Sequence, residues 1–397
     1  MRFERVFIPA GGAWSSPFAR WQGPLSEMSS LDVAVDVTAR ALADRAISPD
    51  EFSELVLGWT VPQPGAFYGA PTVAARIGAP GLTGPMVAQA CATSVAALAV
   101  AAARLEAGDD GAILTVLTDR TSNGPHLVYP SPSSPGGTPR TEDWVADNFA
   151  CDPWAGASMV RTAENVAAEA GIDRRELDEV TLLRYEQYAS ALADDRSFQR
   201  RYMVPVQIPS RRGDPTILDA DVGVHPTSAE GLAKLAPVEP DGVVTYGGQT
   251  HPADGAAGAI VASREAASRL GRGGAVVRLR SVGFTRVAAA QMPKAPVPAA
   301  RRALADAGID VAALHAITTH NPFAVNDVWF SRQTGVRVAD MNVHGSSLVY
   351  GHPQAPTGAR LIAELIETLL LRGGGYGLFT GCAAGDSAAS VVIEVAA

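Results

Sequence analysis

Short apolar runs alternate with alanine-rich stretches along the first 120 residues of the chain. The runs "RVFIPA" and "ELVLGW" have the length and composition of strands, whereas residues 30–46 and 71–77 form alanine-rich segments typical of helices. Strands that alternate with helices are typical of an α/β protein, in which helices cover a sheet. We therefore expect an α/β fold for this part of the chain.

Two segments in opposite halves of the chain repeat the same order of elements. After Cys91, "SVAALAVAAARLEAGDDGAILTVLTDRTS" gives an apolar helix, a glycine-containing break, a strand and a polar turn. From Thr357, "TGARLIAELIETLLLRGGGYGLFTGCAAG" gives the same series, with "LLRGGGYGLFT" opposite "LEAGDDGAILT". Such a repeat predicts a pseudo-symmetric fold. Alanine-rich helix–strand units also resemble one another in unrelated proteins, so the repeat alone leaves the fold open.

The middle of the chain has a different character. It opens with the run "PSPSSPGGTP" and carries strongly charged helices such as "DRRELDEVTLLRYEQYASALADDRSFQRRY". These features indicate an inserted, more polar region rather than core. We therefore predict a first half in residues 1–121, an insertion in 122–243, completion of the first half in 244–270, and a second half in 271–397.

Composition and charge exclude several classes of protein. The chain has 397 residues, of which 47% are hydrophobic, so it can bury a large core. A formal net charge of -9 argues against a nucleic-acid partner. The only cysteines are Cys91, Cys151 and Cys382, an odd number at wide spacing, which favours a reducing compartment over a disulfide framework. The N-terminus lacks a signal-peptide pattern and no apolar run reaches about 18 residues, so we expect a cytoplasmic protein without a membrane partner.

Two cysteines and two histidines are candidates for catalysis. Cys91 follows "PMVAQA", which reads as a buried strand, and opens a long helix whose N-terminus is expected to lower the pKa of a thiol. His320 and His352 each end an apolar run, and Cys382 lies in "TGCAAGDS", a turn expected to expose it. Taken singly, each residue also fits a structural role in the core. Together they supply a thiol nucleophile, a base to ionise it, and a second base for the α-proton beside a thioester.

A zinc site is the competing use of cysteine and histidine. The sequence has no CxxC, HExxH or HxH spacing, and four ligands from four distant loops would be unusual for structural zinc. It also lacks a GxSxG elbow, a Walker loop and a dinucleotide fingerprint. These absences argue against a zinc site and against a bound nucleotide cofactor.

A series of short blocks resembles the thiolase family. "QACATSVAAL" resembles the block around the nucleophilic cysteine of thiolases, and "MVRTAENVA" resembles their "TAEN" segment. "HNPFAVND" stands at the "NEAFA" or "HDAFA" motif, "NVHGSSLVYGHPQAPTGAR" at "NVNGGAIALGHPLGATGAR", and "GCAAGDSAASVVIE" at "CIGGGMGVAMVIE". The blocks keep the family's order and spacing. The resemblance implies an α/β thiolase fold: two pseudo-symmetric halves in αβαβα layers, with mixed five-stranded sheets and an inserted loop domain.

The resemblance also implies a reaction and a role for each candidate residue. Thiolases carry out reversible Claisen condensation and thiolysis of 3-oxoacyl-CoA through an acyl-cysteine. Cys91 would be the nucleophile, His352 its base, and Cys382 the acid and base at the α-carbon. His320 and His352 would form one oxyanion hole, and the backbone N–H groups of Cys91 and Ala384 a second one.

Substrate contacts and assembly follow from the same resemblance. Met159, Thr250 and Phe323 would line the acyl or pantetheine pocket. Coenzyme A would be substrate and product, and no other cofactor would be needed. Relatives form dimers or tetramers, so we expect a homo-oligomer, with the apolar strand "GAILTVL" as a sheet edge available for pairing.

Several positions depart from the family pattern. Ala92 and Ser94 replace glycines of the usual "CGSG" block, and are expected to narrow the acyl pocket. The "GHPxGxTG" turn lacks its middle glycine, which is Ala355 here. Asp386 brings a carboxylate close to Cys382, whose pKa it should raise.

Three alternatives remain open at this point. A ketoacyl synthase of the same superfamily usually has asparagine where His320 or Asn321 stands, and lacks the second reactive cysteine. A specialised thiolase could act on a branched, aromatic or steroid-derived acyl-CoA. A non-catalytic thiolase-like subunit or lipid-transfer partner would need a small accessory protein. The intact Cys/His/His/Cys set favours an enzyme over the last alternative.

Overall fold

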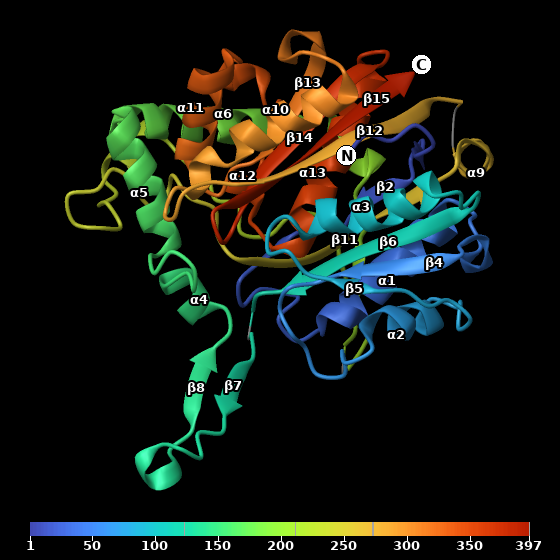
Figure 1. The fold of residues 1–397 in the computed structure, drawn as a ribbon, viewed down its shortest axis with the longest axis horizontal. Helices are drawn as coiled ribbons and strands as arrows, with labels where there is room; N and C mark the ends of the chain where they lie inside the picture. The colour runs from blue at the N-terminus through green and yellow to red at the C-terminus, as the bar shows by residue number, and fades with distance from the viewer. Residues whose placement is uncertain (123, 211, 272–273, 397) are drawn as a thin grey trace.

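A computed structural model describes residues 1–122, 124–210, 212–271 and 274–396. Two groups of strands lie one above the other, with helices between and outside them (Figure 1). Their hydrogen-bonded order is β13 (Leu314–His320), β14 (Gly375–Ala383), β15 (Ser387–Ala396), β12 (Val276–Arg286), β1 (Phe7–Pro9), β11 (Ala253–Ala262), β6 (Ala112–Arg120), β4 (Glu54–Gly58) and β5 (Met86–Val87). The short strands β2 (Ala13–Ser15) and β3 (Ala19–Arg20) pair with β11 off this path.

Strand β1 connects the two groups. Its Phe7 pairs with Ala262 of β11 on one side and with Arg278 of β12 on the other. The two sheets expected from the sequence therefore share one hydrogen-bonded path.

Strand pairing confirms the predicted internal repeat. β6 runs parallel to β4 and antiparallel to β11, and β14 runs parallel to β13 and antiparallel to β15. Helix α3 (Thr93–Glu106) precedes β6 in the chain, as α13 (Ala355–Leu371) precedes β14. The chain is thus built from two halves of equivalent topology.

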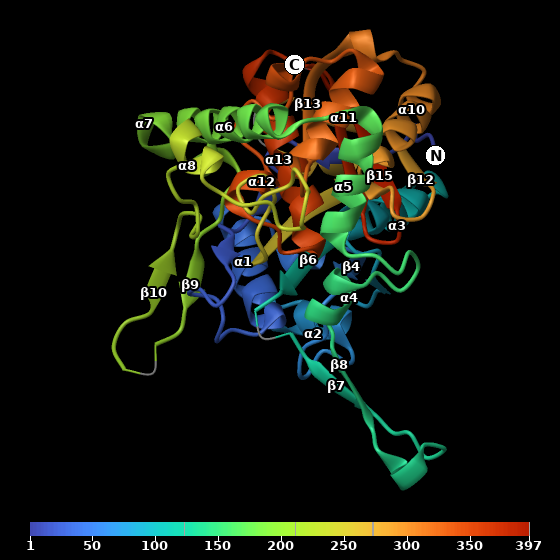
Figure 2. The same ribbon diagram turned by 90° about the vertical axis from the view of Figure 1, so that its left-hand side faces the viewer.

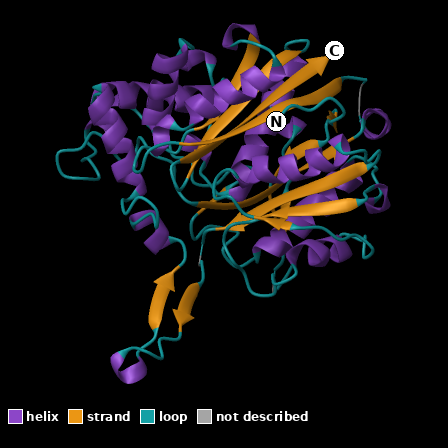
Figure 3. Cartoon of the chain, in the orientation of Figure 1, coloured by secondary structure: helices purple, strands orange, loops and turns teal. Residues whose placement is uncertain are grey.

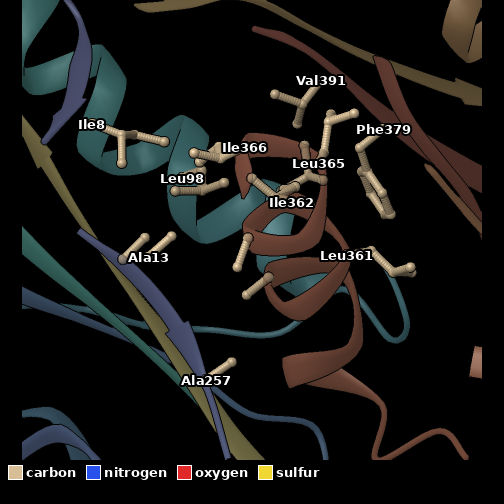
Figure 4. Packing of buried hydrophobic residues seen from close by; sticks show 14 of the residues in the cluster. Ile8, Ala13, Leu98, Ala257, Leu361, Ile362, Leu365, Ile366, Phe379 and Val391 are labelled. Atoms are coloured by element: carbon tan, nitrogen blue, oxygen red, sulfur yellow. The ribbon is translucent and has the colours of Figure 1, made fainter. Parts of the chain in front are cut away.

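Helices α3 and α13 form the middle layer between the strand groups. Residues 355–369 of α13 are all buried, and the helix contacts α3 as well as strands of both halves. Its buried charges are paired, since Arg360 forms an ion pair with Glu364 one turn on. Leu361, Ile362, Leu365 and Ile366 of α13 pack in one cluster with Leu98 of α3 (Figure 4).

Further helices cover the outer faces of the strand groups (Figure 3). They are α1 (Ser30–Asp44) and α2 (Gly69–Arg76) on the first half, and α10 (Pro296–Ala307) and α11 (Ala324–Thr334) on the second. Helix α9 (Arg264–Leu270) packs near β1. The helices predicted over residues 30–46 and 71–77 are confirmed, and their ends differ by no more than two residues.

The polar middle segment supplies the elements between β6 and β11. They are β7 (His126–Tyr129), β8 (Arg140–Asp143), α4 (Ala146–Ala150), α5 (Met159–Ala170), α6 (Arg174–Ala191), α7 (Ala193–Arg196), β9 (Val206–Ile208), β10 (Thr216–Leu218) and α8 (Ala229–Ala233). The β7–β8 and β9–β10 hairpins both project from the body of the molecule (Figure 2). The helices α5 and α6 instead pack on α11, so part of the segment covers the second half.

Two expectations about strands are wrong. "GAILTVL" forms most of β6, which lies between β4 and β11 rather than at an edge. A strand buried on both faces is continuously apolar, so this run indicated a central strand. "PMVAQA" gives only the two-residue strand β5, which is partly exposed and lies at the sheet edge.

No helix in the described part of the chain has the length and apolar character needed to cross a membrane.

Candidate active site

Cys91 lies at the entrance of the central helix. α3 begins at Thr93, whose hydroxyl accepts the N–H of Gln89 and donates to the carbonyl of Ala90. Ala90, directly before Cys91, has a φ of 44°. Such a left-handed conformation in a residue with a side chain costs about 1–3 kcal/mol and is concentrated at functional sites.

A thiol–imidazole pair joins the two halves of the chain. The Sγ of Cys91 lies 3.1 Å from Nε2 of His352, and Nδ1 of His352 lies 2.6 Å from the hydroxyl oxygen of Thr357. The threonine in the first turn of α13 therefore orients the ring so that its other nitrogen faces the sulfur. A nucleophile, a base and a group that orients the base are the parts of an activated nucleophile.

The turn that carries His352 is held from both halves. His352 N–H donates to the carbonyl of His251 at 2.9 Å, and Ala355 N–H donates to the carboxylate of Asp119 at 2.9 Å. Gly351 has a φ of 93°, and a Cβ there would lie 2.7 Å from the His251 ring, so only glycine fits. Gln354 also has positive φ, at 64°.

Burial raises the pKa of Asp119 to about 7. The backbone N–H groups of Thr60, Ala355 and Val61, with the Thr60 hydroxyl, donate to the Asp119 carboxylate and lower its pKa in part. These contacts make Asp119 a link between the turn of His352 and the end of β4.

His320 ends β13 and lies beside His352. The ring centroids are 4.1 Å apart, and Nδ1 of His320 lies 2.9 Å from the hydroxyl oxygen of Ser347. Nε2 of His320 is buried and has no hydrogen-bond partner among the described residues. Burial lowers the pKa of His320 to about 3, so its imidazole is neutral near pH 7.

Cys382 lies inside β14 rather than in an exposed turn. Only 1% of its surface is exposed, and Asn326 Nδ2 donates to its Sγ at 3.3 Å. The expectation of an exposed thiol is therefore wrong, because the β14 strand extends to Ala383.

Burial raises the pKa of the Cys382 thiol well above its usual range. The neighbouring Cys91 adds to this effect, and the carboxylate of Asp386 adds least. The direction predicted for Asp386 is confirmed. Its carboxylate accepts the N–H groups of Ala290 and Gln291, at 2.9 and 2.8 Å.

The resting Cys91–His352 pair is uncharged. Burial raises the pKa of Cys91 to about 12, although the backbone N–H groups of Ala384 and Cys91 lower it. Burial, followed by the neighbouring His320, lowers the pKa of His352 well below 6.5. The prediction that the helix N-terminus leaves Cys91 with a lowered pKa is thus wrong, since loss of solvation outweighs the nearby donors.

A cavity of about 230 Å³ opens onto Cys91 and His352. Met159, Thr250 and Phe323 line it, as the resemblance implied. Its other lining residues are Phe149, Val160, Gln249, Pro252, Met292, Pro322, Gln354 and Ala384. His320 and Cys382 do not line this cavity. They lie in the layer of side chains behind Cys91 and His352.

Ala92 and Ser94 do not narrow the cavity, because neither lines it. Both are buried, and the Ser94 hydroxyl donates to the carbonyl of Ala355 and accepts the N–H of Ala359 at 2.9 Å. A Cβ on Gly358 would lie 3.0 Å from that of Ser94, so the two central helices approach closely here. Ser94 thereby ties the N-terminus of α3 to that of α13.

Three of the four candidate residues also have the spacing of metal ligands. Ligand atoms of Cys91, His320 and His352 lie within 4.8 Å of one another. A thiolate and two imidazoles suit zinc, so the chemistry of the set does not by itself decide between metal and thioester. The cavity that opens onto Cys91 and His352 has room for a ligand larger than a metal ion.

Several residues of the site escaped sequence reasoning. Thr357, Ser347 and Asn326 orient the candidate histidines and Cys382, and Gln354 Oε1 lies 3.3 Å from the Cys91 sulfur. All four residues lie in blocks that carry the family resemblance: Asn326 in "HNPFAVND", and Ser347, Gln354 and Thr357 in "NVHGSSLVYGHPQAPTGAR". The blocks were the available signal, but the atoms that these side chains contact depend on segments that meet only in the folded chain.

Comparison with known proteins decides the family. The model of "Thiolase, N-terminal domain" matches residues 11–265, and that of "Thiolase, C-terminal domain" matches residues 274–395. The chain belongs to the thiolase family. As a thiolase it is an enzyme, of the acyl-CoA acyltransferase class.

Individual relatives agree with this assignment. The acetyl-CoA acetyltransferase of Chromobacterium violaceum is 29% identical over 376 residues, which cover 94% of this thiolase and 95% of that protein. The beta-ketoadipyl-CoA thiolase of Acinetobacter baylyi is 31% identical over 318 residues, 77% of each chain. The crystal structure of human mitochondrial 3-ketoacyl-CoA thiolase in complex with CoA superposes with a TM-score of 0.91 at 25% identity, covering 100% of both chains. These names favour the thiolase assignment over the ketoacyl-synthase and non-catalytic alternatives.

Proposed function

We propose that this thiolase catalyses the reversible thiolysis and Claisen condensation of 3-oxoacyl-CoA through an acyl group on Cys91. The observation that carries the proposal is the 3.1 Å contact between the Cys91 sulfur and Nε2 of a neutral His352, at a cavity large enough for a thioester arm.

In the first half-reaction, His352 accepts the thiol proton as the Cys91 sulfur attacks C3 of the substrate. The S–C3 bond forms and the C2–C3 bond breaks, which leaves acetyl-CoA as its enolate. Cys382 then donates its proton to C2. The pKa of a thiol that is buried beside another thiol lies high, so Cys382 keeps this proton until the enolate needs it.

In the second half-reaction, the thiol of CoA gives its proton to the Cys382 thiolate and attacks the acyl carbonyl. The Cys91 sulfur leaves and takes back the proton from His352, so both cysteines and the histidine are restored. Each step places negative charge on a carbonyl oxygen. We assign its stabilisation to the N–H groups of Cys91 and Ala384 in one step, and to His320 and His352 in the other.

Coenzyme A is the proposed substrate and product, and no other cofactor takes part. The lining residues Met159, Thr250 and Phe323 support a pantetheine arm in the 230 Å³ cavity, and the CoA complex of the human relative supports the ligand. We further propose a cytoplasmic homo-oligomer with the four-segment domain division given above. The three free cysteines support a reducing compartment, and the projecting β7–β8 hairpin supports contacts between subunits.

Mass spectrometry of the acylated protein tests the function directly. Trypsin is expected to release Cys91 in the peptide 77–104 and Cys382 in the peptide that follows Arg372. After brief incubation with acetoacetyl-CoA, the peptide 77–104 should carry one acyl group, and the Cys91→Ala protein should carry none. Acylation of Cys382 instead, or none in the native protein, would contradict the proposal.

A further inference from the structure

A second cavity adjoins the one at Cys91. Its volume is about 450 Å³, within the range of sites that bury a small ligand. Phe149, Gln354 and Ala384 line both cavities, whereas Cys91 and His352 line only the first. These three shared residues therefore form a common wall between the two cavities, next to the reacting sulfur.

The most unusual member of this wall is Gln354. It stands where the quoted thiolase block "GHPLGATGAR" has leucine, and only 5% of its surface is exposed. Its Oε1 lies 3.3 Å from the Cys91 sulfur, and a hydrogen bond with Gln354 raises the pKa of His352. The amide is thus held at the reacting sulfur.

The other end of that amide remains available. Within the described residues, Nε2 of Gln354 donates to no protein acceptor, and it is not among the fully enclosed atoms. A nearly buried N–H group that replaces an apolar side chain is favourable only when it finds an acceptor. An acceptor on the bound acyl group would meet that need.

Apolar and aromatic side chains line most of the second cavity, and two carboxylates give it negative charge. Thr60, Asn148, Trp144 and Trp154 line it together with two carboxylates, Glu142 and Asp152, and no Arg, Lys or His of the described chain does so.

Both carboxylates already have protein partners. Asp152 accepts the N–H groups of Gly385, Trp154 and Ala155, and Glu142 accepts Nδ2 of Asn148 at 2.9 Å. Arg286 stacks on Trp154 and donates to the Gly385 carbonyl, so it offsets part of this charge. Two carboxylates against one guanidinium still make the cavity unfavourable for a ligand carboxylate.

On the basis of the proposed function, we propose that this second cavity receives the distal part of the acyl group on Cys91, and that Gln354 is the specificity-determining residue. It selects acyl groups with an uncharged hydrogen-bond acceptor, such as a hydroxyl or carbonyl oxygen. The first cavity holds the pantetheine arm, so an acyl group of more than a few atoms needs the adjoining space. Plain alkyl groups leave the Gln354 amide unpaired, and acyl groups ending in a carboxylate meet Glu142 and Asp152.

The test measures kcat/KM for thiolysis of three 3-oxoacyl-CoA substrates of equal chain length, bearing a hydroxyl, a methyl or a carboxylate terminus. The native enzyme should prefer the hydroxyl substrate over the methyl substrate by about tenfold, the effect of one well-placed hydrogen bond, and should use the carboxylate substrate least. Gln354→Leu should lower the hydroxyl-to-methyl ratio to near one. Gln333→Leu, on the exposed surface of α11, is the matched control and should keep the native ratio.

Gln354→Met is a second variant for the case in which Gln354→Leu does not fold. It should also lower the ratio, because its side chain lacks the amide N–H. A native ratio near one, or a native-like ratio in a folded Gln354 variant, overturns the inference. Acetoacetyl-CoA separates the two proposals, because its acyl group is too short to reach the second cavity. If the native enzyme does not cleave it, the proposed function fails. If the enzyme cleaves it but does not discriminate among the three longer substrates, only the inference fails.

Discussion

The sulfur of Cys91 and Nε2 of His352 lie 3.1 Å apart, although 261 positions separate them in the chain. Replacing His352 by asparagine removes the imidazole nitrogen that contacts the thiol, while keeping a polar side chain in the turn. We expect kcat/KM for acetoacetyl-CoA thiolysis to fall about 10²–10⁴-fold, the usual contribution of a positioned base. The melting temperature of the variant serves as control, and a folded variant with near-native activity would rule out His352 as the base.

Replacing Cys382 should separate acyl transfer to Cys91 from proton transfer at the α-carbon. In Cys382→Ser, acetyl-CoA should still acetylate Cys91, although more slowly, because that step needs a proton only for the leaving CoA thiolate and none from the α-carbon. Exchange of the acetyl-CoA methyl protons with deuterated water should fall by about 10²-fold or more. Peptide mass spectrometry follows the first process and proton NMR the second. Native exchange rates in this variant would exclude Cys382 as the α-carbon base.

Ser94 should stabilise the contact between the central helices. Ser94→Ala removes both the hydrogen bond to the Ala355 carbonyl and the acceptor of the Ala359 N–H. Because the site is buried, the free energy of unfolding should fall by about 1–3 kcal/mol. Urea unfolding measures the change. Ser268→Ala, on the exposed side of α9, is the matched control and should change stability by less than about 0.5 kcal/mol.

His320 should make the fold sensitive to acid. Burial lowers its folded-state pKa to about 3, against about 6.5 in the unfolded chain. The unfolded chain therefore binds more protons between these values, so the contribution of His320 is complete above pH 6.5 and is lost as the pH falls towards 3. The slope is at most about 1.4 kcal/mol per pH unit. Urea unfolding between pH 7 and 4.5 should show a shallower slope for His320→Asn than for the native protein, and equal slopes would contradict this prediction.

Zinc should inhibit the enzyme by occupying its catalytic groups. Ligand atoms of Cys91, His320 and His352 lie within 4.8 Å of one another, and Nε2 of His320 has no other partner among the described residues. We expect Zn²⁺ to inhibit thiolysis reversibly, with recovery on adding EDTA, and His320→Asn to weaken the inhibition. Prior acetylation of Cys91 should protect the enzyme, since the acylated sulfur no longer offers a thiolate. Undiminished inhibition of the acetylated enzyme would place the zinc elsewhere.

Local pattern was sufficient for part of the fold. The helices near residues 30–46 and 71–77 and the repeat of helix and strand followed from the order of apolar and polar residues, because each depends on neighbours in the chain. Whether a strand lies at the edge or in the centre of the sheet could not be predicted in this way. The run "GAILTVL" is central because β4 and β11 flank it, and both partners come from distant parts of the sequence.

The sequence alone determined which residue types were available for chemistry, and its ordered blocks identified Cys91, His320, His352 and Cys382 as one set. Only the tertiary structure decided how far these side chains are buried and in which direction their pKa values shift. Cys382 lies in a strand rather than an exposed turn, and burial gives Cys91 a raised pKa instead of a lowered one. The contact of Gln354 with the sulfur also depends on two chain segments meeting in space. Solvation and long-range contacts set these properties, and neither is encoded in the pattern of adjacent residues.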